Sequence, residues 1–192
     1  MNTIIPSILK ESSAGFVQRS ITDELFEKRQ IELVGDITPE SAHCIIMQLR
    51  YLESVSNEEI TLFVNSNGGD VASGLAVYDI MKSINCPIRA VCIGTAASMA
   101  AVLFSSGDTR EMFEHSRIMI HDPLICGVNG SALSVDNTAK QLMKTRDILA
   151  KILAQNTGRS IDEILARTSA DCYFDAKEAV EFGLADRIIT SL

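Results

Sequence analysis

The sequence predicts a single α/β domain built on a mainly parallel sheet. Its first half alternates short apolar runs with segments of helical periodicity, and this repetition is typical of parallel strands covered by helices. Glycine-bearing segments follow two of the expected strands, at 65–70 and 94–97. Ligands of such sheets bind at the carboxyl ends of strands, so these two segments are the first places to look for a site.

The elements of the first half follow from this pattern. A short helix is expected at 23–29. A second opens at Thr38-Pro39, because a capping hydroxyl precedes a proline at the first helical position. Apolar residues at helical spacing predict a third across 71–84. The expected strands are 31–34, 60–64 and 88–93, and a small-residue turn at 94–97 leads into an Ala-rich helix that begins at Ser98.

The second half predicts two more strands, at 111–113 and 117–120, and a long helix over 131–157 that Gly158 ends. Capping patterns at Ser160 and Asp175 open two short helices, and 186–189 reads as a last strand. Residues 1–20 lack such a pattern, and we expect a mobile arm there with a turn near Ser12 to Gly15. Residues 21–192 would form the one domain.

Composition limits the function classes. Lys and Arg number 17 against 25 Asp and Glu, a net charge of −8, which argues against nucleic acid or an anionic membrane as the main partner. No apolar run has transmembrane length, and the first residues lack a signal-peptide pattern. The five cysteines show no CxxC spacing, so we expect reduced, mostly buried thiols, no metal site and a cytoplasmic location. They are Cys44, Cys86, Cys92, Cys126 and Cys172.

Ser98 is the candidate nucleophile. It follows an expected strand and a tight turn at a helix start, where a hydroxyl is exposed and backbone N–H groups point at what it attacks. Small neighbours let a substrate backbone approach closely. The alternative is an N-cap serine in a turn between packed elements, and the local pattern alone favours that reading.

His121 is the candidate base. It comes directly after the expected strand 117–120 and before Asp122-Pro123, so its imidazole can reach the turn of a neighbouring strand. The alternative is a hydrogen-bonded surface histidine. The other two histidines are less suited, since His43 lies on the polar flank of a helix and His115 in a turn between charged residues.

Asp171 is the candidate partner of that base. It lies in an expected loop between two short helices, ahead of Tyr173-Phe174, and apolar cover suits an acid that orients an imidazole. It could instead be a plain loop acid or helix cap. From the residues alone, Asp122, Asp136 and Asp162 remain alternatives.

Asn67-Gly68-Gly69 is the second glycine site. Paired glycines after a buried strand allow unusual dihedrals and a free backbone N–H, as an oxyanion hole requires. A tight turn without function is the alternative. A phosphate-binding loop is weakly supported, because neither GxxxxGK nor GxGxxG is present.

Together, four ordered motifs resemble the proteolytic subunit of the Clp protease, the ClpP family. The resemblance runs from Ile5-Pro6 to about Asp186. The segments 94–101 (GTAASMAA), 117–123 (RIMIHDP) and 63–69 (FVNSNGG) are similar to that family's serine, histidine and glycine-loop motifs. The ending from Thr157-Gly158 to Asp186 is similar too, and it puts Asp171 on the family's aspartate.

The resemblance implies a crotonase-like α/β fold of stacked strand-strand-helix units. It also implies two stacked heptameric rings around a proteolytic chamber, interlocked by the helix at 131–157 as a handle. Residues 1–20 would line the axial pore, where a Clp AAA+ unfoldase docks and delivers unfolded polypeptides. The partner would consume the ATP, and the chain itself would need no cofactor and no metal.

The resemblance also assigns roles. Ser98, His121 and Asp171 would form the triad of a serine endopeptidase that works through an acyl-enzyme. Gly69 and Met99 would supply the oxyanion N–H groups, and substrate would contact Gly68, Val71, Leu124 and Ile125.

Several positions depart from the family pattern and indicate a divergent paralogue. Asn67, Asp70, Ala100 and Asp122 replace a proline, a small or apolar residue, a glycine and a glutamine. A carboxylate at Asp122 would favour a charged His121. The departures keep open a catalytically weak ClpP-like subunit of a mixed ring, and the fold would also suit a crotonase-type acyl-CoA enzyme.

Overall fold

A computed structural model describes residues 6–13, 15–125 and 127–192, and it has the expected α/β architecture. The main sheet runs in the order β3-β4-β5-β6-β9, and these neighbours are all parallel. The strands are β3 (Gln30–Ile37), β4 (Ile60–Gly69), β5 (Ile88–Ala97), β6 (Thr109–Phe113) and β9 (Arg187–Ile189). Off this path, β7 (Arg117–Ile120) pairs with β5 and with β8 (Cys172–Phe174).

The central strand β5 has two successive neighbours on one side. Its first part, Arg89 to Cys92, pairs in parallel with β6, and its last part, Thr95 to Ala97, pairs in parallel with β7. Just beyond, Ser98 N donates to Met119 O at 2.8 Å. The carboxyl ends of β5 and β7 therefore lie together, which sets up the site described below.

Seven helices are present in the described residues. They are α1 (Ile21–Glu27), α2 (Pro39–Val55), α3 (Val71–Ser83), α4 (Met99–Ser105), α5 (Ala132–Thr157), α6 (Ile161–Thr168) and α7 (Ala176–Phe182). The predicted caps are confirmed: Thr38 accepts a hydrogen bond from Ser41 N, and Asp175 forms a capping box with Glu178. Ser131 precedes α5 and Gly158 ends it in the left-handed conformation.

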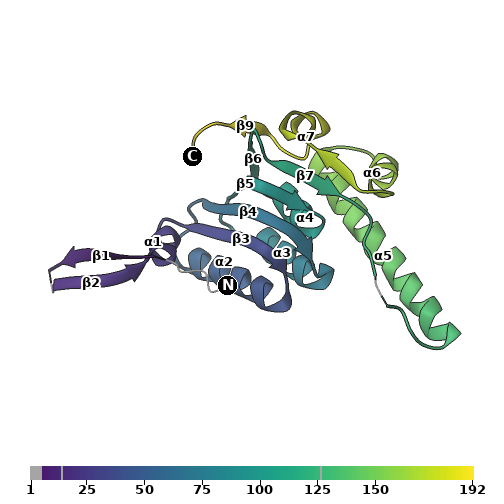
Figure 1. Cartoon of the computed structure of the whole chain (residues 1–192), viewed down its shortest axis with the longest axis horizontal. Helices are drawn as coiled ribbons and strands as arrows, with labels where there is room; N and C mark the ends of the chain where they lie inside the picture. The colour runs from purple at the N-terminus through teal and green to yellow at the C-terminus, as the bar shows by residue number, and fades with distance from the viewer. Residues whose placement is uncertain (1–5, 14, 126) are drawn as a thin grey trace.

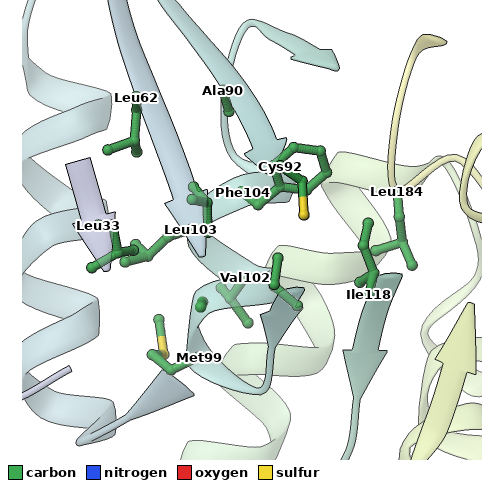
Figure 2. Packing of buried hydrophobic residues seen from close by; sticks show 14 of the residues in the cluster. Leu33, Leu62, Ala90, Cys92, Met99, Val102, Leu103, Phe104, Ile118 and Leu184 are labelled. Carbon is green, nitrogen blue, oxygen red and sulfur yellow. The ribbon is translucent and has the colours of Figure 1, made fainter. Parts of the chain in front are cut away.

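Helix α4 is the centre of the hydrophobic core. All seven of its residues are buried, which is typical of a helix that is apolar all round. Figure 2 shows Met99, Val102, Leu103 and Phe104 among side chains of the strands, with Leu33 from β3 nearby. The residue that precedes this helix, Ser98, therefore directly adjoins the buried core.

Several predicted boundaries are wrong: the helix expected at 23–29 lies two residues earlier, at Ile21–Glu27, and the strand expected at 31–34 runs from Gln30 to Ile37. The expected loop at 65–70 is mostly strand, because β4 continues to Gly69 and pairs with β3 through Ile37. The expected turn at 94–97 is the last part of β5. Small and polar residues concealed both extensions, and register shifts near Asn65 mark where regular pairing with the neighbouring strands is interrupted.

The N-terminal segment contains two strands that its sequence does not indicate. β1 (Ser7–Ser12) and β2 (Gly15–Ser20) pair as an antiparallel hairpin, and the expected turn at 12–15 includes residue 14, which lies outside the described residues. Figure 1 shows this hairpin projecting from the sheet, and α5 projecting at the opposite end of the view. The part of the segment before residue 6 lies outside the described residues.

The described cysteines, all free, partly match expectation. Cys86 and Cys92 are buried, but Cys172 is half-buried and Cys44 is exposed. Cys126 lies outside the described residues. No described helix is both long and apolar enough to cross a membrane. Groups of three or more His, Cys, Asp or Glu side chains that could hold a metal ion are absent from the same residues.

Candidate active site

Ser98 has a backbone conformation that is rare for a residue with a side chain. Its φ is 55° and its ψ −125°, between the end of β5 and the start of α4. Although it stands at the N-cap position, its side chain makes no capping hydrogen bond. The interpretation of Ser98 as a plain helix cap is therefore wrong. A serine with a strained backbone, whose hydroxyl makes no hydrogen bond to the helix that follows, is typical of a functional position.

The Ser98 hydroxyl faces His121 instead. Ser98 Oγ lies 2.8 Å from His121 Nε2, a good hydrogen-bond distance. With the imidazole proton on Nδ1, the hydroxyl donates to Nε2, which is the arrangement that general-base catalysis needs. The His121 side chain is 15% exposed, so the imidazole is mostly shielded from water yet reachable.

Asp171 reaches the other side of the same imidazole. Its Oδ1 lies 3.4 Å from His121 Nδ1, longer than the roughly 2.7–3.2 Å of a good N–H···O hydrogen bond. Its side chain is 58% exposed. The contact depends on β8, a strand that the sequence did not reveal. β8 pairs antiparallel with β7, and the last pair is Ile120 with Cys172. His121 directly follows Ile120 and Asp171 directly precedes Cys172, so the two lie next to each other beyond this pair.

The second glycine site packs directly against Ser98. A Cβ atom added at Gly68, where φ is +94°, would lie 2.7 Å from Ser98 Cβ and 3.0 Å from Met99 N. Gly68 N donates to Ser66 Oγ, and Asp70 N donates to Ile37 O. Gly69 is paired with Ile37 of β3 in the strand register, and its φ is +150°. Met99 is the first residue of α4, where an N–H has no partner within the helix.

A small, mostly apolar cleft adjoins the serine and histidine. The residues that line it are Val71, Ser98, Met99, Val102, Ile120, His121, Pro123, Leu149 and Leu153. Of the predicted substrate-binding residues, Val71 lies in this cleft, whereas Leu124 and Ile125 are exposed beyond it. Leu149 and Leu153 of α5 also line the cleft, and the sequence does not indicate this, because nothing local shows what the apolar face of a helix covers.

The alternative residues are placed elsewhere. His43 and His115 are exposed, and Asp136 pairs with Lys140 one turn along α5. The Asp122 carboxylate is hydrogen-bonded to Arg146 and Thr168. Both of its oxygens are thereby engaged in hydrogen bonds to other elements of the fold.

Asp70 is a further carboxylate near the glycine site. Its side chain caps α3, accepting from Ser73 N at 2.8 Å and from the Ser73 hydroxyl. These two hydrogen bonds, the one from the hydroxyl first, hold the pKa of Asp70 below its ordinary value. Asp70 is thus a helix cap that stays charged at neutral pH.

A family model matches most of the chain. The model of the Clp protease family, described as "Clp protease", matches residues 13–192, which is all but the first twelve residues. The match includes the three residues of the candidate triad and the glycine site beside it. With this extent of the match, the chain belongs to the Clp protease family.

Proposed function

We propose that this chain is a serine endopeptidase of the Clp type, with Ser98 as nucleophile, His121 as general base and Asp171 as the acid that orients it. The observation that carries the proposal is the 2.8 Å contact between Ser98 Oγ and His121 Nε2. The strained backbone of Ser98 and its missing cap bond support it, because they leave the hydroxyl for chemistry.

The reaction is acyl transfer. Ser98 Oγ attacks the peptide carbonyl carbon while His121 Nε2 takes the hydroxyl proton, and the C–N bond breaks as the imidazolium returns that proton to the amine. Water then attacks the acyl-enzyme, with His121 again as the base, and releases the carboxylate product. Asp171 stabilises the imidazolium. The scheme requires no metal and no cofactor.

Gly69 and Met99 are the proposed oxyanion donors. Support comes from the position of Met99 N at the start of α4 and from the close approach of the neighbouring Gly68 to Ser98 and Met99 N. Gly68 lets these two backbone segments approach each other, since no Cβ separates them. Both amides then meet the negative charge that develops on the carbonyl oxygen.

The cleft beside Ser98 is the proposed pocket for the substrate side chain on the acyl side of the scissile bond. Val71, Leu149 and Leu153 give it an apolar lining, so we propose a preference for apolar residues there. Leu124 and Ile125 are exposed and lie directly after His121-Asp122-Pro123. In this proposal they contact the extended substrate backbone.

The assembly is proposed from the family. Two stacked heptameric rings would enclose the sites, α5 would interlock the rings, and the β1-β2 hairpin would stand at the axial pore. Exposed apolar side chains on α5 support an interface there, with Leu133 77% and Met143 53% exposed. A Clp AAA+ ATPase in the cytoplasm would deliver unfolded polypeptides and use the ATP. Native mass measurement tests the stoichiometry.

A second candidate is a catalytically weak subunit of a mixed ring. The 3.4 Å separation of His121 from Asp171, and the exposure of Asp171, favour it. In this case the triad would work poorly in the isolated chain.

One experiment separates the two. The pure protein and its Ser98→Ala variant are treated with a fluorophosphonate probe and assayed with a fluorogenic peptide that carries an apolar residue before the scissile bond. Labelling and cleavage by wild type alone support the peptidase. The peptidase proposal fails if wild type is neither labelled nor active, even when a Clp ATPase is added.

A further inference from the structure

Asp122 joins three separate elements at one carboxylate. Its Oδ2 accepts a hydrogen bond from Arg146 Nε of α5 at 2.6 Å, and its Oδ1 accepts one from the Thr168 hydroxyl at the end of α6, also at 2.6 Å. Its backbone N–H donates to Thr168 O at 2.7 Å. We refer to Asp122, Arg146 and Thr168 as the clamp.

The clamp lies directly next to two members of the triad. His121 precedes Asp122, and Asp171 follows Thr168 by three residues. Pairing between β7 and β8 ends at Ile120 and Cys172. His121 and Asp171 are therefore held on one side by this last strand pair and on the other by the contacts between Asp122 and Thr168.

Its surroundings distinguish the clamp from an ordinary surface ion pair, which contributes little. The Asp122 side chain is 30% exposed, that of Arg146 is 24% exposed, and Thr168 is buried. Three hydrogen bonds meet at one residue, two of them to an ionised carboxylate, and such bonds are shorter and stronger than neutral ones. Asp122 thereby fixes the segment that follows β7, which carries His121, relative to the segment that follows α6, which carries Asp171.

The third element, α5, also forms a wall of the cleft. Leu149 and Leu153 line the cleft, and Arg146 precedes Leu149 by one helical turn on the same helix. The ion pair with Asp122 thus sets the position of this wall relative to His121.

Building on the proposed function, we propose that Asp122 is a positioning residue: through Arg146 and Thr168 it sets the separation of His121 from Asp171 and holds α5 against the cleft. Its effect on His121 is geometric. Loss of the clamp would lengthen a contact that is already 3.4 Å, and small misplacements of catalytic groups have large effects on rate.

The test measures acylation of Ser98 by the fluorophosphonate probe, with the rate constant and the probe affinity determined separately. Asp122→Asn keeps the size of the side chain and an oxygen that accepts from the Thr168 hydroxyl, but it removes the negative charge that pairs with Arg146. Arg146→Gln removes the positive charge of the same ion pair. We expect each to lower the acylation rate constant by roughly 10-fold, and Asp122→Ala by up to about 100-fold. Because the pair acts as a unit, the double variant should lose no more than either single one.

Three comparisons separate positioning from a general effect on folding. Asp136→Asn is the matched control, since it removes an exposed ion pair with Lys140 from α5, and it should leave the rate constant unchanged. Arg146→Lys, which keeps a cation, should recover part of the lost rate. In a His121→Ala background, Asp122→Asn should have no further effect, because its influence passes through His121. A further loss there, or the same loss in the control, would overturn the proposal.

The clamp and the proposed function can fail independently. If wild type is not labelled at Ser98, the peptidase proposal fails, and crystal structures of wild type and Asp122→Ala then test the clamp. A longer separation of His121 from Asp171 in the variant supports it, and an unchanged separation refutes it.

Discussion

Replacing Gly68 by alanine should disable the site through a single methyl group. The added Cβ would lie 2.6 Å from Ala97 O and 2.7 Å from Ser98 Cβ. Ordinary contact begins near 3.4 Å, so the Ala97 to Ser98 segment must retreat by about 0.8 Å. That segment carries the nucleophile and leads into α4, whose residues are all buried, so it has little room to move.

The expected cost has two parts. Alanine at a φ of +94° costs about 1–2 kcal/mol from the left-handed conformation alone. Crowding of the packed surroundings adds about 1–3 kcal/mol. The free energy of unfolding should therefore fall by about 2–5 kcal/mol, and a nucleophile displaced by a large fraction of an ångström should lose about 100-fold in acylation rate.

Gly158→Ala is the control for the conformational part. Gly158 has a φ of +71° at the end of α5, and nothing lies within 4 Å of an added Cβ. It should cost about 1 kcal/mol, with Ser98 labelling unchanged. Both variants are compared by thermal unfolding and by the labelling rate at a temperature where each is folded. Wild-type labelling by Gly68→Ala, or equal destabilisation by the two variants, would refute the steric argument.

Two further predictions concern stability. Arg29 is buried, and its guanidinium donates to four backbone carbonyls at and after the end of α2. Arg29→Met should therefore lower the free energy of unfolding by about 2–4 kcal/mol, measured as a lower melting temperature. Lys28→Met, at the exposed neighbouring residue, should leave the melting temperature unchanged. Burial alone would raise the pKa of Glu111, but hydrogen bonds from Arg89 and Arg187 outweigh it, and the pKa lies below its ordinary value. The stabilisation from this lowered pKa is complete above the unfolded-state pKa, near 4.3, and is lost as the pH falls through the folded-state pKa. The difference in melting temperature between wild type and Glu111→Gln should therefore become smaller from pH 7 to about pH 3. A difference that stays constant over this range would contradict the argument.

Much of the fold could be predicted because the deciding signals are local. The Thr38-Pro39 start of α2, the capping box at Asp175 and the left-handed Gly158 all depend on residues within one helical turn. The apolar runs of β4 and β5 likewise show in the sequence. Their glycine- and alanine-rich ends do not, since strand pairing there rests on partners elsewhere in the chain.

Contacts between distant segments account for what sequence reasoning missed. The three-residue strand β8 has no pattern of its own, and it exists because β7 is beside it. Leu149 and Leu153 look like any apolar face of a helix until α5 is placed against the cleft. The triad could be assembled only through motif resemblance, which carries information about spatial neighbours that periodicity lacks.

Asp122 shows the limit of interpreting a residue from its neighbours in the sequence alone. As a carboxylate beside His121 in the sequence, it predicts an electrostatic effect on the imidazole. In the fold its two oxygens meet Arg146 and Thr168, 24 and 46 residues away. In our proposal, this carboxylate acts through the position that it enforces on His121 and Asp171. Asp122 is therefore best understood together with Arg146, and variants of the pair are more informative than variants of either residue alone.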